Sequence, residues 1–120
     1  MYEIIFYRDK DGNEPVKEFL DSLLGSNDKD SRIRANKILE YMDKLSEFGT
    51  RIGKPTVKYI GDDIWELRPT KDRIFFVGWS GKNFILLHHF VKKSQKTPSK
   101  EIATARRRYN DLKERTDSYE

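Results

Sequence analysis

The chain has 120 residues, of which 36% are hydrophobic, 37% charged and 12% aromatic. This length predicts a single domain over residues 1–120, and the aromatic content favours a packed core over disorder. The absence of cysteine excludes disulfides, thiolate nucleophiles and cysteine-based zinc or iron–sulfur sites. Because no apolar run approaches the roughly 20 residues of a membrane span and the N-terminus lacks signal-peptide character, we expect a cytoplasmic protein without membrane contact.

The net charge of +4 is unevenly distributed along the chain. Residues 1–50 hold 8 Lys and Arg against 11 Asp and Glu, residues 51–108 hold 14 against 5, and residues 109–120 hold 2 against 4. The net charges are therefore −3, +9 and −2. Basic clusters attract polyanions, because phosphates that bind Lys and Arg release counterions. The middle segment is a candidate for nucleic-acid contact, with a solvated lysine-rich surface as the alternative.

The first part of the sequence predicts one strand and two helices. Residues 2–7 are rich in aromatic and β-branched residues, which indicates a short strand. A helix is predicted to begin at Pro15, with Asn13 as its cap, and to end at Gly25. A second helix follows and ends at Gly49, which predicts a helical hairpin. Its apolar stripe is formed by residues at helical spacing, namely Ile33, Ile38, Tyr41, Met42, Leu45 and Phe48.

The second part predicts four strands and a last helix. The strands are Val57–Ile60, Ile64–Arg68, Arg73–Trp79 and Asn83–Val91. The turns between them are short, which forces antiparallel neighbours. The last helix is predicted to begin at Pro98 with Thr97 as its cap, and residues 116–120 are expected to fray. The order β-α-α-β-β-β-β-α predicts an α+β fold, in which an N-terminal helical hairpin and a C-terminal helix pack on an antiparallel sheet.

Basic residues gather near one end of this predicted sheet. Side chains alternate between the faces of a strand, so Arg68 shares a face with Glu66, and Arg73 shares one with Phe75. The gathered residues are Lys58, Arg68, Arg73, one of His88 and His89, Lys92, Lys93 and Lys96. The aspartates of the turns lack the spacing of a metal cage, so we expect no metal and no cofactor.

Several segments occur in a fixed order in the second half of the chain. They are Trp65–Pro69 (WELRP), Asp72–Phe76 (DRIFF), Leu86–Pro98 (LLHHFVKKSQKTP), Glu101–Ala103 (EIA) and Ala105-Arg106 (AR). Together they resemble the phage-related HigB-like branch of the RelE/ParE toxin superfamily, and nearly the whole chain fits this pattern. The resemblance implies the RelE-like microbial ribonuclease fold. It also implies the toxin of a type II toxin–antitoxin system, which cleaves messenger RNA in the decoding site of the ribosome.

The resemblance also implies partners. These are the ribosome with its messenger RNA, and a cognate antitoxin that usually carries a helix-turn-helix part. The antitoxin of such a pair forms a hetero-oligomer with the toxin, neutralises it and represses their shared operon. Two other functions remain open. The ParE branch has the same fold but inhibits DNA gyrase without catalysis, and a toxin that has lost its activity acts as a binding module or co-repressor.

Metal-free RNA cleavage removes a proton from the 2′-OH, stabilises charge on the phosphoryl oxygens and protonates the leaving 5′-oxygen. The resemblance assigns Arg73 to the scissile phosphate, since its strand matches the catalytic arginine strand of the family. Arg68 is a second candidate, because arginine is a charged, bidentate phosphate donor; its alternative role is an ion pair with Glu66. We expect Arg73→Ala to leave folding intact and relieve toxicity.

The other catalytic candidates are His88, His89, Lys92 and Lys93. Either histidine is a possible general acid, with a structural role as the alternative. The two lysines occupy the position where the family places basic catalytic residues, and crowding by like charges favours a lysine that acts as a base. Candidates for binding RNA phosphates are Lys58, Lys96 and Arg106. We expect Lys92→Ala and Lys93→Ala to reduce cleavage more than Lys10→Ala.

Overall fold

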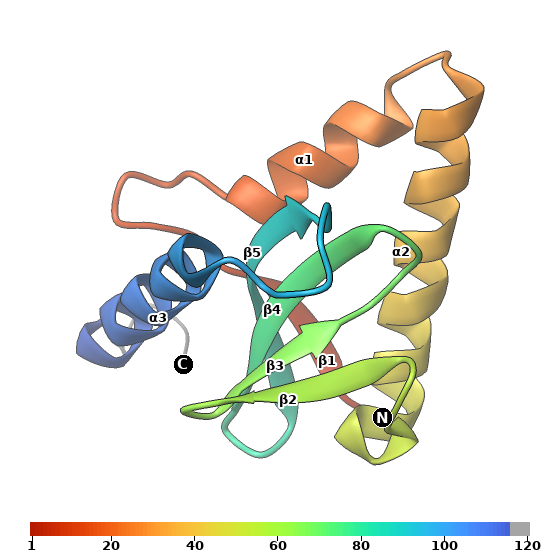
Figure 1. Cartoon of the computed structure of the whole chain (residues 1–120). Helices are drawn as coiled ribbons and strands as arrows, with labels where there is room; N and C mark the ends of the chain where they lie inside the picture. Colours follow the sequence, from red (N-terminus) through yellow and green to blue (C-terminus); the bar gives the residue numbers. More distant parts are fainter. Residues whose placement is uncertain (116–120) are drawn as a thin grey trace.

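Five strands form one sheet within residues 1–115, the part of the chain that the computed structural model describes (Figure 1). In chain order they are β1 (Glu3–Phe6), β2 (Val57–Gly61), β3 (Ile64–Leu67), β4 (Asp72–Trp79) and β5 (Asn83–Val91). Their order across the sheet is β1-β5-β4-β3-β2. The pairs from β2 to β5 are antiparallel, as the short turns predict.

β1 is the exception, because it pairs parallel with β5, Glu3 lying opposite Asn83. The connection between these two strands contains most of the domain, so no short turn constrains their relative direction. The sheet is therefore antiparallel except at the edge that β1 forms.

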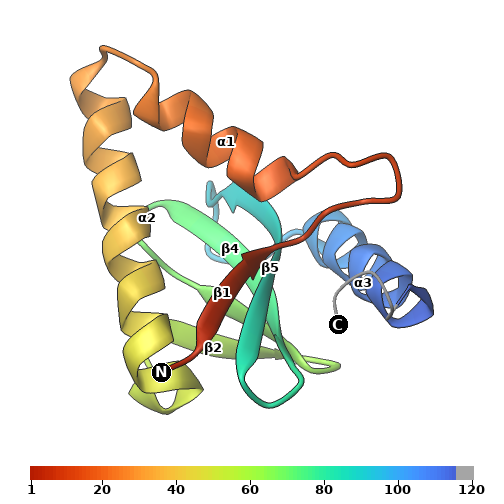
Figure 2. The ribbon, with the colours of Figure 1, turned by 180° about the vertical axis from the view of Figure 1, so that it is seen from behind.

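The helices lie on both faces of the sheet, as the two opposite views in Figures 1 and 2 show. They are α1 (Pro15–Leu24), α2 (Lys29–Phe48), a 3₁₀ turn η1 (Gly49–Ile52) and α3 (Ser99–Glu114). The hairpin of α1 and α2 covers one face and α3 packs on the other. The predicted α+β class and element order are confirmed, whereas the predicted fraying of residues 116–120 lies outside the described residues.

Strand alternation divides the core into two apolar clusters. On β4, Ile74 and Phe76 point toward the α1–α2 hairpin, where they pack with Ile38. Phe75 and Val77 point toward α3 and join a second cluster. Of the described residues, Ile74, Phe75, Phe76 and Val77 are each at most 1% exposed. β4 is thus the central strand of a three-layer arrangement, and this fixes which face each neighbouring side chain takes.

The predicted caps of α1 and α3, Asn13 and Thr97, are wrong, and the predicted start of α3 is wrong by one residue. α1 begins at Pro15 as predicted, but Glu14 precedes it and no side chain caps it. Asn13 instead donates from its backbone N–H and its side-chain amide to the Asp9 carboxylate, which closes the preceding loop. α3 begins at Ser99, one residue later than predicted, because Pro98 is still extended, with ψ of 136°.

The predicted apolar stripe of α2 is correct at its centre and wrong at its ends. Ile38 and Leu45 are buried, whereas Ile33 and Phe48 are 50% and 47% exposed. At 3.6 residues per turn, Ile33 lies about 140° around the helix from Ile38, which places it away from the sheet. Ala35, in the same part of α2, is fully buried instead of Ile33, so a small side chain packs in the core there.

Candidate functional site

An open hollow lies at the end of the sheet where β3 and β5 finish and β4 begins. Its volume is about 530 Å³, and the described residues that line it are Arg68, Arg73, Lys92, Lys93, Ser94 and Gln95. Antiparallel pairing creates this site, because the end of β3 and the start of β4 are neighbours in register, with Leu67 opposite Ile74. The backbone N–H of Lys92 donates to the Lys71 carbonyl over 2.8 Å and brings the end of β5 to the same place. Four of the predicted residues, all cationic, therefore meet in one hollow.

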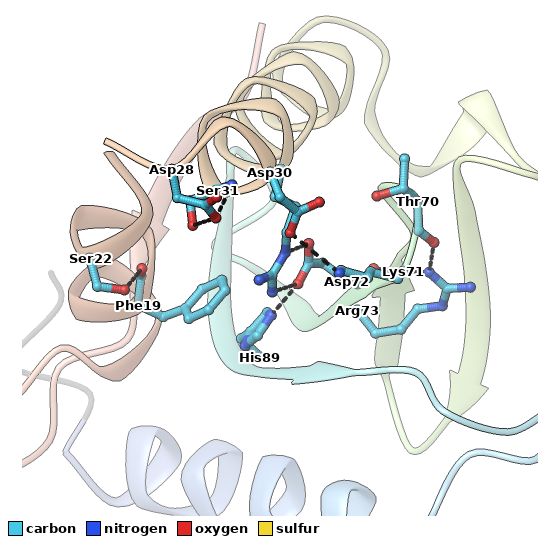
Figure 3. Close-up of polar contacts among 11 residues, drawn as sticks. Phe19, Ser22, Asp28, Asp30, Ser31, Thr70, Lys71, Asp72, Arg73 and His89 are labelled. Atoms are coloured by element: carbon cyan, nitrogen blue, oxygen red, sulfur yellow. Dashed lines mark hydrogen bonds and ion pairs between the residues drawn. The ribbon is translucent and has the colours of Figure 1, made fainter. Parts of the chain in front are cut away.

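Arg73 is held by backbone carbonyls beside the hollow. Its Nη1 donates to the carbonyl oxygens of Thr70, over 2.5 Å, and of Asp72, over 2.9 Å; Figure 3 shows the side chain turned toward Thr70. Its Nε is buried and has no hydrogen-bond partner among the described residues. Burial lowers the pKa of Arg73, a shift that Glu66 opposes and Arg68 increases. Arginine remains charged in proteins, so a partly desolvated cation lines the hollow.

Arg68 lies next to a carboxylate that is almost completely buried. Its Nε is 3.4 Å from Oε1 of Glu66, whose side chain is 1% exposed. Oε2 of Glu66 has no hydrogen-bond partner within the described residues. From the sequence, Glu66 is expected only as an alternative ion-pair partner of Arg68. Strand alternation indicates that Glu66 lies near both arginines. It places Glu66 on the same face of the sheet as Arg68. Glu66 also lies opposite Phe75 on β4, and Phe75 shares its face with Arg73.

The predicted lysines separate into two groups. Lys92 is partly buried, and its Nζ donates to Thr97 Oγ1 over 3.2 Å, while Lys93 is exposed at the rim. Lys96 is exposed but is not among the lining residues. Lys58 is exposed on the edge strand β2, opposite Glu66, and also lies outside the lining. The structure therefore brings Lys92 and Lys93 into the hollow but not Lys58 or Lys96.

The two predicted histidines lie on opposite faces of β5, and neither lines the hollow. His88 faces α3, where its Nε2 is 2.7 Å from Glu101 Oε1 and its Nδ1 is 3.3 Å from Arg108 Nη1. Arginine only donates hydrogen bonds, so Nδ1 is the acceptor and the Nε2–H donates to Glu101. Burial lowers the pKa of His88, which agrees with this neutral tautomer. These contacts give His88 a structural place between β5 and α3.

His89 faces the other way and belongs to a buried ionic cluster, which we call the Arg34–Asp72–His89 clamp (Figure 3). Asp72 is fully buried and accepts hydrogen bonds from His89 Nε2 at 2.7 Å and from Arg34 Nε and Nη2 at 3.0 and 2.7 Å. The His89 ring also stacks on Phe19 of α1, with the ring centroids 3.5 Å apart. Burial alone would raise the pKa of Asp72, but the bonds from His89 and Arg34 outweigh it and lower this pKa to about 2.

The clamp joins three elements next to the hollow. It connects α2 with Asp72, the first residue of β4, and with His89 near the end of β5. The next residue along β4 is Arg73, which lines the hollow. Arg34 could not be found from the sequence, because 38 positions separate it from Asp72 and no local pattern connects them.

Arg106 is also remote from the hollow. Its Nη2 is 2.7 Å from Oδ2 of Asp62, which lies in the turn between β2 and β3 at the opposite end of β3. The neighbouring Arg108 donates to the Leu87 carbonyl at 2.8 Å, under α3. Successive arginines on a helix point in different directions, so these side chains form no common phosphate-binding face.

Residues 1–115 contain no group of three or more His, Asp or Glu side chains that could hold a metal ion. In the same region no helix combines the length and apolar character needed to cross a membrane.

No curated protein matches the sequence. The family described as Phage derived protein Gp49-like (DUF891) matches residues 24–110, which include α2, strands β2 to β5, most of α3 and every residue lining the hollow. The chain therefore belongs to the phage-derived Gp49-like family.

Proposed function

We propose that this protein is the toxin of a type II toxin–antitoxin system and that it cleaves messenger RNA bound to the ribosome. One observation supports this function above others: four cationic side chains, at or just beyond the ends of three strands, converge on one open hollow. A phosphodiester is the ligand that such a set of donors suits, because arginine and lysine supply charge-assisted hydrogen bonds to its oxygens. The resemblance of the same segments to HigB-like and RelE toxins supports the reaction.

The proposed reaction is metal-free. The 2′-oxygen attacks the adjacent phosphorus, the bond from phosphorus to the 5′-oxygen breaks, and the products are a 2′,3′-cyclic phosphate and a 5′-hydroxyl. Arg73 and Arg68 stabilise the charge that develops on the phosphoryl oxygens. Neither histidine lines the hollow, so we assign the proton transfers to Lys92 and Lys93. One lysine accepts the proton of the 2′-OH and the other donates a proton to the 5′-oxygen.

The partners follow from this proposal. The substrate is messenger RNA in the ribosome, which places the activity in the cytoplasm. A cognate antitoxin, with a helix-turn-helix part that binds the operon, would form a hetero-oligomer with the toxin and block the hollow. The adjacent reading frame is the place to look for it.

The test is induced expression without antitoxin, followed by growth measurement and mapping of messenger RNA ends. We expect growth arrest and new 5′ ends inside translated reading frames. Arg73→Ala should abolish both, since removal of one charge-stabilising donor costs about 10²–10³-fold in rate. Lys10→Ala, in the acidic part of the chain, is the matched control and should remain toxic.

Two outcomes would contradict the proposal in different ways. Intact transcripts together with blocked DNA replication would identify a gyrase inhibitor. Normal growth at confirmed expression of folded wild-type protein would identify a binding module or co-repressor.

A further inference from the structure

Three buried side-chain atoms without a hydrogen-bond partner lie in one place. They are Glu66 Oε2, Arg68 Nε and Arg73 Nε, and residues 1–115 contain no other such side-chain atom. Folded proteins seldom leave buried polar atoms unpaired, and the exceptions concentrate at functional sites. Two of these atoms are donors and the third is an acceptor, so the three are complementary in hydrogen bonding.

The carboxylate lies behind the arginines. Glu66 is 1% exposed, whereas the Arg68 side chain is 27% exposed and Arg73 is of intermediate exposure. Both arginines line the hollow and Glu66 does not. Glu66 therefore forms an ion pair with Arg68 and acts on Arg73 through its charge, but it is itself shielded from a ligand in the hollow.

The charges of the three side chains suggest what Glu66 does. Two guanidinium groups on neighbouring strands repel each other, and Arg68 acts on Arg73 in this sense. Glu66 acts in the opposite sense on Arg73 and lies 3.4 Å from Arg68 Nε, so one buried negative charge compensates both cations. A fixed counter-charge keeps both forks in place before a ligand arrives, which is the preorganisation that charge stabilisation requires.

We propose that Glu66 is a positioning residue, which holds Arg68 and Arg73 side by side to receive one phosphodiester. This inference rests on the proposed function, because the phosphodiester is its substrate. Glu66 does not touch the reacting atoms, and its own charge reduces the attraction of the hollow for RNA. Its loss should therefore affect catalysis and binding in opposite directions.

The test uses Glu66→Gln, which keeps the size of the side chain and removes its charge. Two assays are run on the full chain: cleavage of messenger RNA on programmed ribosomes, which gives kcat and KM, and binding of a 2′-O-methyl RNA oligonucleotide, which cannot be cleaved and gives the Kd. We expect kcat to fall about 10- to 100-fold, as for a small misplacement of catalytic groups, while the Kd stays equal or becomes lower. Asp62→Asn is the matched control, since it removes a carboxylate paired with Arg106 and should change neither quantity.

A thermal melt of each variant separates positioning from folding. If Glu66→Gln does not fold, a double-mutant cycle with the milder Glu66→Asp and with Arg68→Gln replaces it. Positioning predicts that the Glu66→Asp loss in kcat largely disappears when Arg68 is already replaced. Additive losses in the cycle would overturn the inference, as would a Glu66→Gln protein that folds and retains wild-type kcat. Loss of kcat and of oligonucleotide affinity in parallel with a lower Tm would reduce Glu66 to a structural residue.

The same measurements distinguish failure of the proposed function from failure of the role assigned to Glu66. A wild-type protein that folds, binds the oligonucleotide and cleaves no ribosomal messenger RNA would overturn the proposed function and the role of Glu66 in it. A cleaving wild type with an equally active Glu66→Gln variant would overturn the role of Glu66 alone.

Discussion

Single side chains in the hollow differ in what each contributes. Arg73 presents a planar fork whose orientation is set by two backbone carbonyls, whereas Lys93 is an exposed point charge at the rim. A fork can follow the geometry of a phosphate as it changes during reaction, whereas an ammonium group is a point charge that can also exchange a proton. Variants that change the shape of a side chain but keep its charge should therefore affect kcat more than the Kd for RNA.

Arg73→Lys keeps the positive charge and loses the fork. We expect its kcat for ribosomal messenger RNA to fall about 10²-fold, with the Kd for uncleavable RNA changed less than threefold. Single-turnover cleavage and fluorescence anisotropy measure the two effects. An Arg73→Lys variant with wild-type kcat would show that only the charge at this position matters.

Lys93→Ala tests a charge at the rim. If this lysine transfers a proton, as we propose, kcat falls about 10²–10⁴-fold. If it only attracts RNA, kcat persists and KM rises. Lys96→Ala is the matched control, because it removes a neighbouring exposed lysine that does not line the hollow.

At the scale of secondary-structure elements, the Arg34–Asp72–His89 clamp joins α2, β4 and β5. Removing one partner of a buried ion pair leaves the other charge uncompensated. We expect Asp72→Asn to lower the free energy of unfolding by about 3–5 kcal/mol at neutral pH, measured by urea denaturation. Asp30→Asn is the matched control, because Asp30 pairs with Lys71 at 3.5 Å on the surface and should cost less than about 1 kcal/mol.

The clamp also makes a prediction about acid stability. The pKa of Asp72 is lowered from 3.8 to about 2 in the folded protein. The unfolded chain therefore takes up this proton first, and the contribution of Asp72 is present above pH 3.8 and lost as the pH falls toward 2. The stability difference between wild type and Asp72→Asn should shrink through this window in urea titrations at successive pH values. A difference that stays constant would show that Asp72 acts without its charge.

The elements themselves could largely be predicted from the sequence, because they depend on local patterns. The strand Asn83–Val91 is correct at both ends, and Pro15 begins α1. Contacts between distant segments could not be predicted in this way. The pairing of Asp72 with Arg34, and the opposite directions of His88 and His89, depend on which helix covers which face of the sheet. Alternation showed that the histidines point apart, but not what each would meet.

At the scale of the whole molecule, the segment 51–108 with its net charge of +9 is not one basic surface. Its cations lie in the hollow, on the edge strand β2, on α3 and in other segments, and on α3 Arg106 pairs with Asp62 and Arg108 with a backbone carbonyl. The sequence therefore indicated the end of the sheet at which Arg68, Arg73, Lys92 and Lys93 gather. It overestimated how many cations lie there, because Lys58 and Lys96 do not line the hollow.

Salt dependence can count the cations that act together. Each phosphate of single-stranded RNA that the protein neutralises contributes about 0.7 to the slope of log Kd against log salt. The four cations of the hollow therefore predict a slope of at most about 3, and of less where two of them share one phosphodiester. Arg73→Ala should reduce this slope by at most about 0.7, and Arg106→Ala should leave it unchanged. Anisotropy titrations with uncleavable RNA at several salt concentrations give these slopes. A reduced slope for Arg106→Ala would place α3 in the RNA-binding surface.

The parallel pairing of β1 with β5 sets an order of events during synthesis. Glu3 is made among the first residues, but its partner in the sheet is Asn83. Strands β2 to β5 can pair through local hairpins as they emerge, whereas β1 must wait for β5 and then close a long loop. A nascent chain therefore lacks its complete sheet for most of its translation, and a chain that stops before residue 83 has no strand for β1 to join.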